Sequence, residues 1–204
     1  GTGGDFGAIQ VFELPTMTQV AEWQHNNTPI QGQIRIMKQM IDQIAEDLKG
    51  FGVSQPEIYY SIENNTIGES ALLVINDFGE ENIPGMFVSE PIRKGHIRKF
   101  RKGFNTTHRT KISACARLKS MVEKGKLKIH SKPFITELKA FVASGSSYKA
   151  KTGETDDLVS SMLLAMRIIT VLKDWDPKVY TSFSQADEDT ADRVYPLPLF
   201  ISSS

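Results

Sequence analysis

The sequence has a single cysteine, Cys115, among its 204 residues. One cysteine excludes an internal disulfide and any zinc site built from cysteines. The four histidines are not spaced as zinc ligands are. No apolar run approaches the roughly 20 residues that a membrane-spanning helix needs, and we find no signal peptide. These absences favour a reducing compartment and predict no membrane association.

A P-loop is also missing, because the pattern GxxxxGK[ST] does not occur. The chain is therefore not a P-loop ATPase, and its formal net charge of zero names no partner. Acidic residues are absent from Pro91 to Val122, where ten Lys and Arg residues occur. A solvated loop is the simple explanation, but this many unopposed cations favours contact with nucleic-acid phosphates. The candidates are Arg101, Lys102, Arg109 and Lys111.

Hydrophobic periodicity predicts alternating strands and helices after an initial pair of strands. We expect strands at 6–14, 18–25, 57–63, 86–88 and 127–130, and a small hairpin within 144–153. Helices are expected at 34–48, 68–78, 110–124, 133–143 and 156–175, and a basic loop at 91–109. This order predicts an α/β fold in which helices cover both faces of a mixed sheet. We place one domain at 1–176, and we expect the tail at 177–204 to be mobile or draped over the surface.

Three acidic residues stand at positions where catalytic groups gather. Glu63 ends an apolar strand, and ligands collect at the carboxyl ends of strands in open α/β sheets. Asp156 and Asp157 open the most apolar helix of the chain. A solvated strand end for Glu63 and simple helix capping for the Asp pair are the structural alternatives. Two adjacent carboxylates repel each other unless a cation joins them, which favours a shared metal site.

The ligand types predict the kind of metal. Carboxylates without Cys or paired His favour hard ions, Mg²⁺ or Mn²⁺. Two such ions can activate a water and stabilise the leaving oxygen of a phosphodiester. Glu63 and Asp157 are the expected metal ligands, and Asp156 is expected beside them.

A set of short motifs resembles the C-terminal nuclease domain of the large terminase of T4-like tailed bacteriophages. The resemblance runs from Gly1 to about Trp175 and is specific because the pieces occur together and in order. They are Gly1-x-Gly3-x-Asp5-Phe6, His25-Asn26-Asn27-Thr28, Ile62-Glu63-x-Asn65-x-x-Gly68, Arg109-Thr110-Lys111, Leu118-Lys119, Glu123-Lys124-x-Lys126-Leu127-x-Ile129-His130 and Asp156-Asp157-Leu158-Val159.

The resemblance implies a ribonuclease H-like fold and metal-dependent cleavage of double-stranded DNA during genome packaging. It assigns catalytic, metal-binding roles to Glu63 and Asp157. It also implies partners, namely the portal, the small terminase subunit and an ATPase domain of the same full-length protein, and a location in the host cytoplasm.

One departure from the family concerns the residues before Gly1. The family has its first catalytic Asp on a central strand immediately upstream, so we expect a fragment of a longer protein that lacks this strand. Asp5 lies near the place of that Asp and is a candidate to assist. We expect weak or no metal binding at ordinary Mg²⁺ concentration, and the place of the strand to be filled by residues 194–201 or by a partner chain. Direct pairing of the strands at 8–12 and 58–62 is the alternative.

Two other functions remain open at this stage. The chain could be a non-catalytic module that binds DNA or a motor protein. It could also be a ribonuclease H-like enzyme of another purpose, such as a junction resolvase. Metal-dependent nicking of plasmid DNA distinguishes a nuclease from a non-catalytic module. A preference for branched DNA would indicate a junction resolvase.

Overall fold

The computed structural model describes residues 7–94 and 97–183, without the side chains of residues 66, 67, 92–94, 97–101 and 175. The strands are β1 (Gly7–Glu13), β2 (Thr18–His25), β3 (Tyr59–Tyr60), β4 (Met86–Phe87), β5 (Glu90–Lys94), β6 (Ile97–Arg101), β7 (Phe141–Ser144) and β8 (Ser147–Ala150). The helices are α1 (Ile30–Gly50), α2 (Thr66–Phe78), α3 (His108–Glu123), α4 (Lys132–Ala140) and α5 (Asp157–Trp175), with a short 3₁₀ turn, η1 (Glu80–Asn82).

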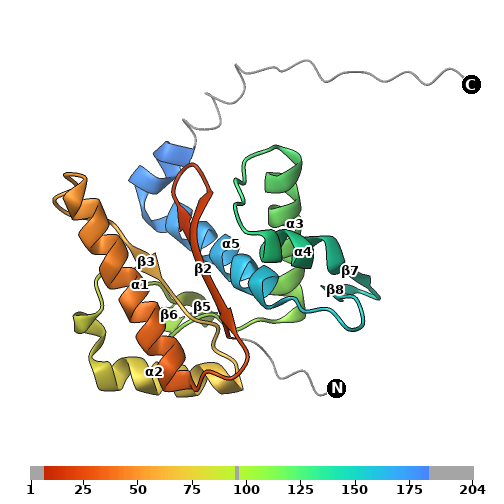
Figure 1. Cartoon of the computed structure of the whole chain (residues 1–204), viewed down its shortest axis with the longest axis horizontal. Helices are drawn as coiled ribbons and strands as arrows, with labels where there is room; N and C mark the ends of the chain where they lie inside the picture. The colour runs from red at the N-terminus through yellow and green to blue at the C-terminus, as the bar shows by residue number, and fades with distance from the viewer. Residues whose placement is uncertain (1–6, 95–96, 184–204) are drawn as a thin grey trace, which may run out of the picture.

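Helix α5 occupies the middle of the molecule. Figure 1 shows the β1–β2 hairpin crossing it, with α1 and α2 on one side and α3, α4 and the β7–β8 hairpin on the other. The sequence explains this position, because α5 is apolar nearly all round and must be buried on several sides. Leu158, Val159, Met162 and Met166 have no exposed surface. The other elements therefore pack around α5.

Buried side chains form two clusters. The larger one surrounds α5 and includes Phe104, Phe134 and buried residues of α3. The smaller one lies between α1 and α2 and includes Tyr60 of β3. The two residues of β3 point to different clusters, since Tyr59 packs against the larger one. Strand β3 thus lies at the boundary between the two parts of the core.

The strands pair less extensively than a single mixed sheet would require. Within the described residues the strands form four two-stranded sheets, of which β3–β4 is parallel and the other three are antiparallel. Single parallel bridges extend two of them, from Thr18 to Lys128 and from Glu63 to Phe104. The described strands and helices form a mixed α/β structure, as predicted, and its parallel and antiparallel pairs are divided among small sheets.

No ladder joins β1 to β3 in the described part of the chain, so direct closure of these two strands does not occur. Each of the two has one hydrogen-bonded partner, β2 for β1 and β4 for β3. The expected filling by residues 194–201 falls outside the described residues and stays a prediction.

Three local expectations need correction. Residues 91–109 are not a loop throughout, because β5 and β6 form a hairpin with Ile92 opposite Lys99. The β-forming residues in this stretch pair despite the dense charge, because backbone pairing in a ladder does not depend on side-chain charge. The strand expected at 57–63 is short, and the helix expected at 133–143 ends at Ala140, where β7 begins.

The segment after α5 is helical at residues 177–183. Val179 and Phe183 of this segment are buried and join the larger core cluster. The beginning of the expected tail therefore packs on the core rather than lying over the surface. No helix among the described residues has both the length and the apolar character required to cross a membrane.

A matched pair of substitutions tests the burial of α5. Leu172 of α5 is 2% exposed and Leu73 of α2 is 67% exposed. Leu172→Ala should lower the free energy of unfolding by about 2–5 kcal/mol, because it leaves a cavity in the core. Leu73→Ala should change it by less than about 0.5 kcal/mol. Urea denaturation followed by circular dichroism measures both, and equal losses would contradict this packing.

Candidate active site

Glu63 is held in place by backbone bonds on both sides. It follows β3 and forms a parallel bridge with Phe104. The Asn64 amide donates to the Phe104 carbonyl at 2.7 Å, and the Phe104 amide donates to the Ile62 carbonyl at 3.0 Å. At the other end of β3, the Tyr59 hydroxyl donates to Asp176 Oδ2 at 3.0 Å. Burial, with this bond to Asp176, raises the pKa of Tyr59 to about 12.

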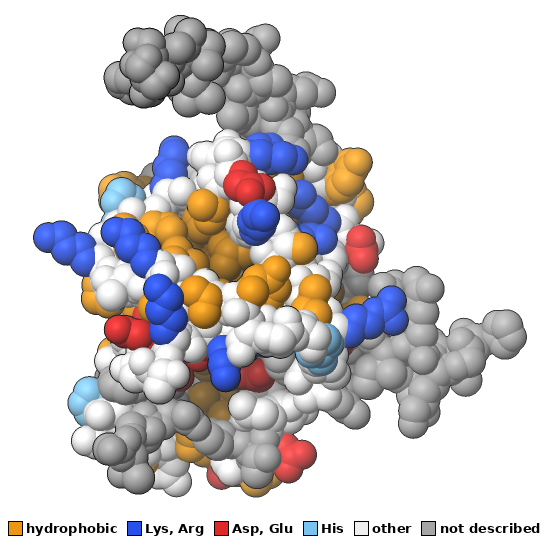
Figure 2. Space-filling model, turned by 90° about the vertical axis from the view of Figure 1, so that its right-hand side faces the viewer, with side chains coloured by type: hydrophobic (Ala, Val, Ile, Leu, Met, Phe, Trp, Pro, Cys, Tyr) orange, Lys and Arg blue, Asp and Glu red, His pale blue; other side chains and the backbone are white. Residues whose placement is uncertain are grey.

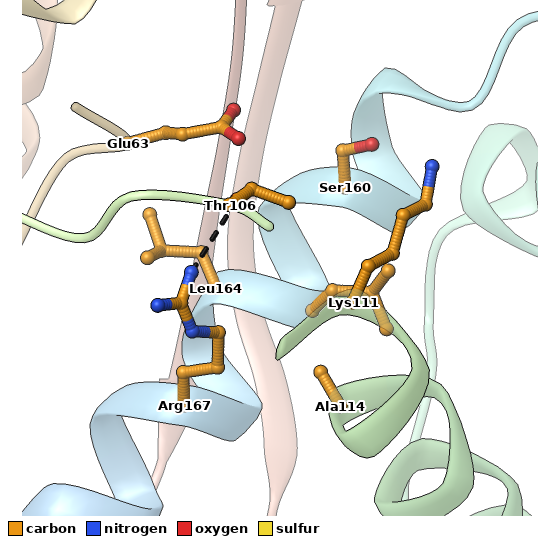
Figure 3. Close-up of a pocket in the computed structure, with 8 residues that line it drawn as sticks. Glu63, Thr106, Lys111, Ala114, Ser160, Leu164 and Arg167 are labelled. Carbon is orange, nitrogen blue, oxygen red and sulfur yellow. Dashed lines mark hydrogen bonds between the residues drawn. The ribbon is translucent and has the colours of Figure 1, made fainter. Parts of the chain in front are cut away.

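The half-buried Glu63 lines a small pocket of about 80 Å³. In Figure 3 its carboxylate extends toward α5, with Ser160 and Lys111 on the opposite side. Strand-end, α3 and α5 residues therefore face one space, which is lined by Glu63, Thr106, Lys111, Ala114, Ser160, Leu163, Leu164 and Arg167. Glu63, the acid predicted at a strand end, and residues of the predicted helix α5 therefore line the same pocket.

The two aspartates lie one helical turn before Ser160. Asp156 is the N-cap of α5 and Asp157 is its first residue. Residues three and four apart share a helix face, so both positions lie on the side of α5 that carries Ser160 into the pocket. Asp156 Oδ2 accepts a bond from the Ala150 amide at 3.2 Å. Ser160 lines the Glu63 pocket and the Asp pair is not among its lining residues, so the sharing of one metal by Glu63 and Asp157 remains a prediction.

A buried carboxylate that sequence reasoning missed lies at the same helix end. Glu137 of α4 is 6% exposed. Its Oε2 accepts from the amides of Leu158 and Val159 at 2.8 and 3.2 Å. Its Oε1 accepts from Gln24 Nε2 at 2.8 Å and from the Thr155 hydroxyl at 2.9 Å. The available signal was an acid on the inward face of α4, three residues after Phe134 and four before Phe141.

A second missed feature is the ion pair between Arg167 of α5 and Glu90 of β5, whose side chains are 11% and 23% exposed. Arg167 also donates to the Asn105 carbonyl at 3.1 Å and to the Thr106 hydroxyl at 3.3 Å. Its guanidinium lies 5.0 Å from the ring centroid of Phe104. Arg167 therefore fixes the segment 104–106, and this segment forms the bridge to Glu63.

The predicted basic residues are placed differently from one another. Lys111 lines the pocket, and its Nζ lies 5.6 Å from the ring centroid of Phe141. Arg109 is exposed on the first turn of α3. Lys102 forms an ion pair with Glu80 at 2.8 Å, so its charge already has a partner. Arg101 ends β6 with a side chain outside the described part, and Asp5 falls outside the described residues.

The surface around α3 and the β7–β8 hairpin carries more positive than negative side chains. Figure 2 views this side and shows apolar side chains gathered in the middle, with Lys and Arg around them and fewer Asp and Glu. On α3, Lys111 lines the pocket that contains Glu63, and Arg109 is exposed on the same turn. Such a distribution suits a polyanion approaching the pocket.

Glu63, Asp156 and Asp157 carry carboxylate oxygens, which are the ligands that hard divalent ions prefer. Mg²⁺ is commonly held by one or two carboxylates and keeps several waters. Glu63 and the Asp pair offer oxygen ligands of this kind. Among residues 7–94 and 97–183, no set of three or more His, Cys, Asp and Glu side chains is placed to hold a metal. The described residues thus contain no preformed site of three such ligands, and a metal held by Glu63 and Asp157 stays a prediction that rests on the chemistry of their carboxylates.

Comparisons with known proteins identify the family and the fold. Residues 1–167 match the family model described as the terminase RNaseH-like domain. The structure is also similar to a crystal structure of the large terminase nuclease from thermophilic phage G20c with bound cobalt, with a TM-score of 0.56 and 16% sequence identity. That match covers 82% of this chain and 77% of the other, and it shows a common ribonuclease H-like fold.

The Arg167–Glu90 pair predicts a non-additive mutational effect. Arg167→Met should lower the free energy of unfolding by on the order of 3 kcal/mol, because it leaves Glu90 partly buried without its cation. The double variant Glu90→Gln, Arg167→Met should lose less, since both charges are then gone. Chemical denaturation of the two single variants and the double variant gives the coupling energy. Additive losses would show that the pair does not fix segment 104–106.

Proposed function

Because the chain belongs to the family of terminase RNaseH-like domains, we propose that it is a metal-dependent endonuclease that cuts double-stranded DNA during viral genome packaging. The observation that carries this proposal is the pocket that Glu63 shares with the first turns of α5, where Asp156 and Asp157 begin the helix.

The motifs that include Ile62-Glu63 and Asp156-Asp157 favour the T4-like branch of the family. The portal, the small terminase subunit and an ATPase domain are the partners that this function implies.

In the proposed site Glu63 and Asp157 hold Mg²⁺ or Mn²⁺, with Asp156 beside them. A divalent ion bound there would activate a water and stabilise the leaving oxygen of a phosphodiester. The bound cobalt of the similar phage G20c nuclease supports a divalent metal in this chain too. Asp5, which precedes β1, is the remaining acid that we propose to assist at the site.

The protein's own groups would orient the substrate. Lys111 lines the pocket and Arg109 is exposed on the same turn of α3, and we propose that both contact DNA phosphates. Phosphate contacts of this kind position the duplex without reading its sequence. Arg167 has a different role, because its bonds to segment 104–106 keep the bridge to Glu63 in place.

Cleavage of supercoiled plasmid in Mn²⁺ or Mg²⁺ tests the proposed reaction. Glu63→Gln and Asp157→Asn should each lower the rate by more than about 100-fold, since even outer partners of metal ligands are worth 10–100-fold. Glu69→Gln, at an exposed position on α2, is the matched control and should cleave normally. No metal-dependent nicking by the unmodified chain, even at metal concentrations well above the ordinary level at which we expect weak binding, would contradict the proposal and indicate a non-catalytic DNA-binding module.

The salt dependence of DNA binding distinguishes the proposed contact residues. Lys111→Ala should reduce the slope of log K against log salt by about one unit, because one phosphate contact is lost. Lys38→Ala removes the same charge type from α1, where Lys38 is paired with Asp42 at 2.7 Å and is not a predicted contact, so the slope should change little. Fluorescence anisotropy in EDTA measures both without cleavage. An unchanged slope in Lys111→Ala would remove this residue from the DNA-binding surface.

A further inference from the structure

The amino end of α5 is capped from another helix. An N-cap side chain normally accepts from the amides two and three positions into its own helix. Asp156 occupies the N-cap of α5 but makes no such bond. The amides of Leu158 and Val159, at those two positions, both donate to Glu137 of α4.

This arrangement leaves Asp156 with a different contact. Its Oδ2 accepts from the Ala150 amide at the end of β8. Thr155, a residue type that can also cap a helix, donates its hydroxyl to Glu137 instead. Thr155 and Asp156 are suited to capping α5 but do not cap it. Glu137, a buried acid 21 positions from Leu158, caps the helix instead.

A carboxylate at 6% exposure is costly unless its oxygens are satisfied. Four donors satisfy Glu137, and the positive end of the helix dipole adds to them. Two of the four donors are backbone amides, so the position of Glu137 determines where the first turn of α5 begins. Gln24 connects the same carboxylate to β2. Elements α4, β2 and α5 are thus joined at the residues that flank Asp156 and Asp157.

We propose that Glu137 is the positioning residue of the active site and fixes the first turn of α5 so that Asp157 can share a metal with Glu63. The inference rests on the proposed function, because it concerns the same metal site. Glu137 does not itself touch the metal or the DNA. It acts through the backbone of Leu158 and Val159 and through Thr155.

The test is metal binding by the intact chain, followed as the rise in Tm with increasing Mn²⁺. Glu137→Gln keeps the shape of the side chain but directs N–H groups toward donors, so at least one bond is lost. We expect it to fold with a lower Tm and to need about 10–100-fold more Mn²⁺ for the same rise in Tm. Thr155→Val removes only the hydroxyl bond and should move the Mn²⁺ midpoint less, in the same direction.

Phe134→Leu is the matched control for lost stability. Phe134 lies on α4 and is fully buried. Its amide donates to the Ser131 hydroxyl and not to the Glu137 carboxylate. This variant should lower Tm through reduced packing while keeping the Mn²⁺ midpoint of the unmodified chain. If Glu137→Gln does not fold, the decision rests on Thr155→Val compared with Phe134→Leu.

The outcomes separate the inference from the proposed function. If the unmodified chain gains stability from Mn²⁺ and Glu137→Gln loses Tm but keeps the Mn²⁺ midpoint, Glu137 is a structural cap only and the inference is wrong. Because we expect weak binding at ordinary metal concentration, the titration extends well above it. If Mn²⁺ does not raise the Tm of the unmodified chain even there, the metal site itself is contradicted, together with the proposed function. A shifted midpoint in Glu137→Gln with a normal midpoint in Phe134→Leu supports the positioning role.

Discussion

The burial of α5 on nearly every side is the constraint on which the rest of the structure depends. An apolar helix of 19 residues needs neighbours on all faces, and the β1–β2 hairpin, α3 and α4 supply them. Polar side chains within this helix and at its ends must then find partners inside the protein. Glu137 accepts a hydrogen bond from the amino end of α5, and Glu90 accepts one from Arg167. Beyond the carboxyl end, the Tyr59 hydroxyl donates to Asp176. These polar contacts set the position of α5 relative to β3 and α4.

The residues of the proposed site are therefore supported from two directions. Glu63 depends on segment 104–106, which Arg167 fixes from the middle of α5. The Asp pair depends on Glu137, which fixes the start of the same helix. Both sets of contacts act through backbone groups, which are harder to displace than exposed side chains. A site held this way is set by the fold before any ligand arrives.

Local patterns in the sequence predicted most of the helices and strands. They also predicted that the acidic residues of the proposed site lie at the ends of such elements. Periodicity placed the β1–β2 hairpin, α1, α3 and α5, and it put Asp156 and Asp157 at the start of the buried helix. The hairpin β5–β6 was missed because the dense charge obscured the strand-forming residues. Glu137 and Arg167 were missed for a different reason. Their partners lie 18 to 113 positions away in sequence, and no local pattern reports contacts over such separations.

The position of β3 between two core clusters has a consequence for cooperativity. Clusters of this kind can open separately, with free energies below that of global unfolding. Tyr60 ties the strand that carries Glu63 to the α1–α2 cluster, whereas Leu158 and Val159 tie Asp157 to the α5 cluster. A ligand held by both acids would join the two units, so that neither could open without releasing it. Binding would then extend the region that unfolds as one, in addition to stabilising it.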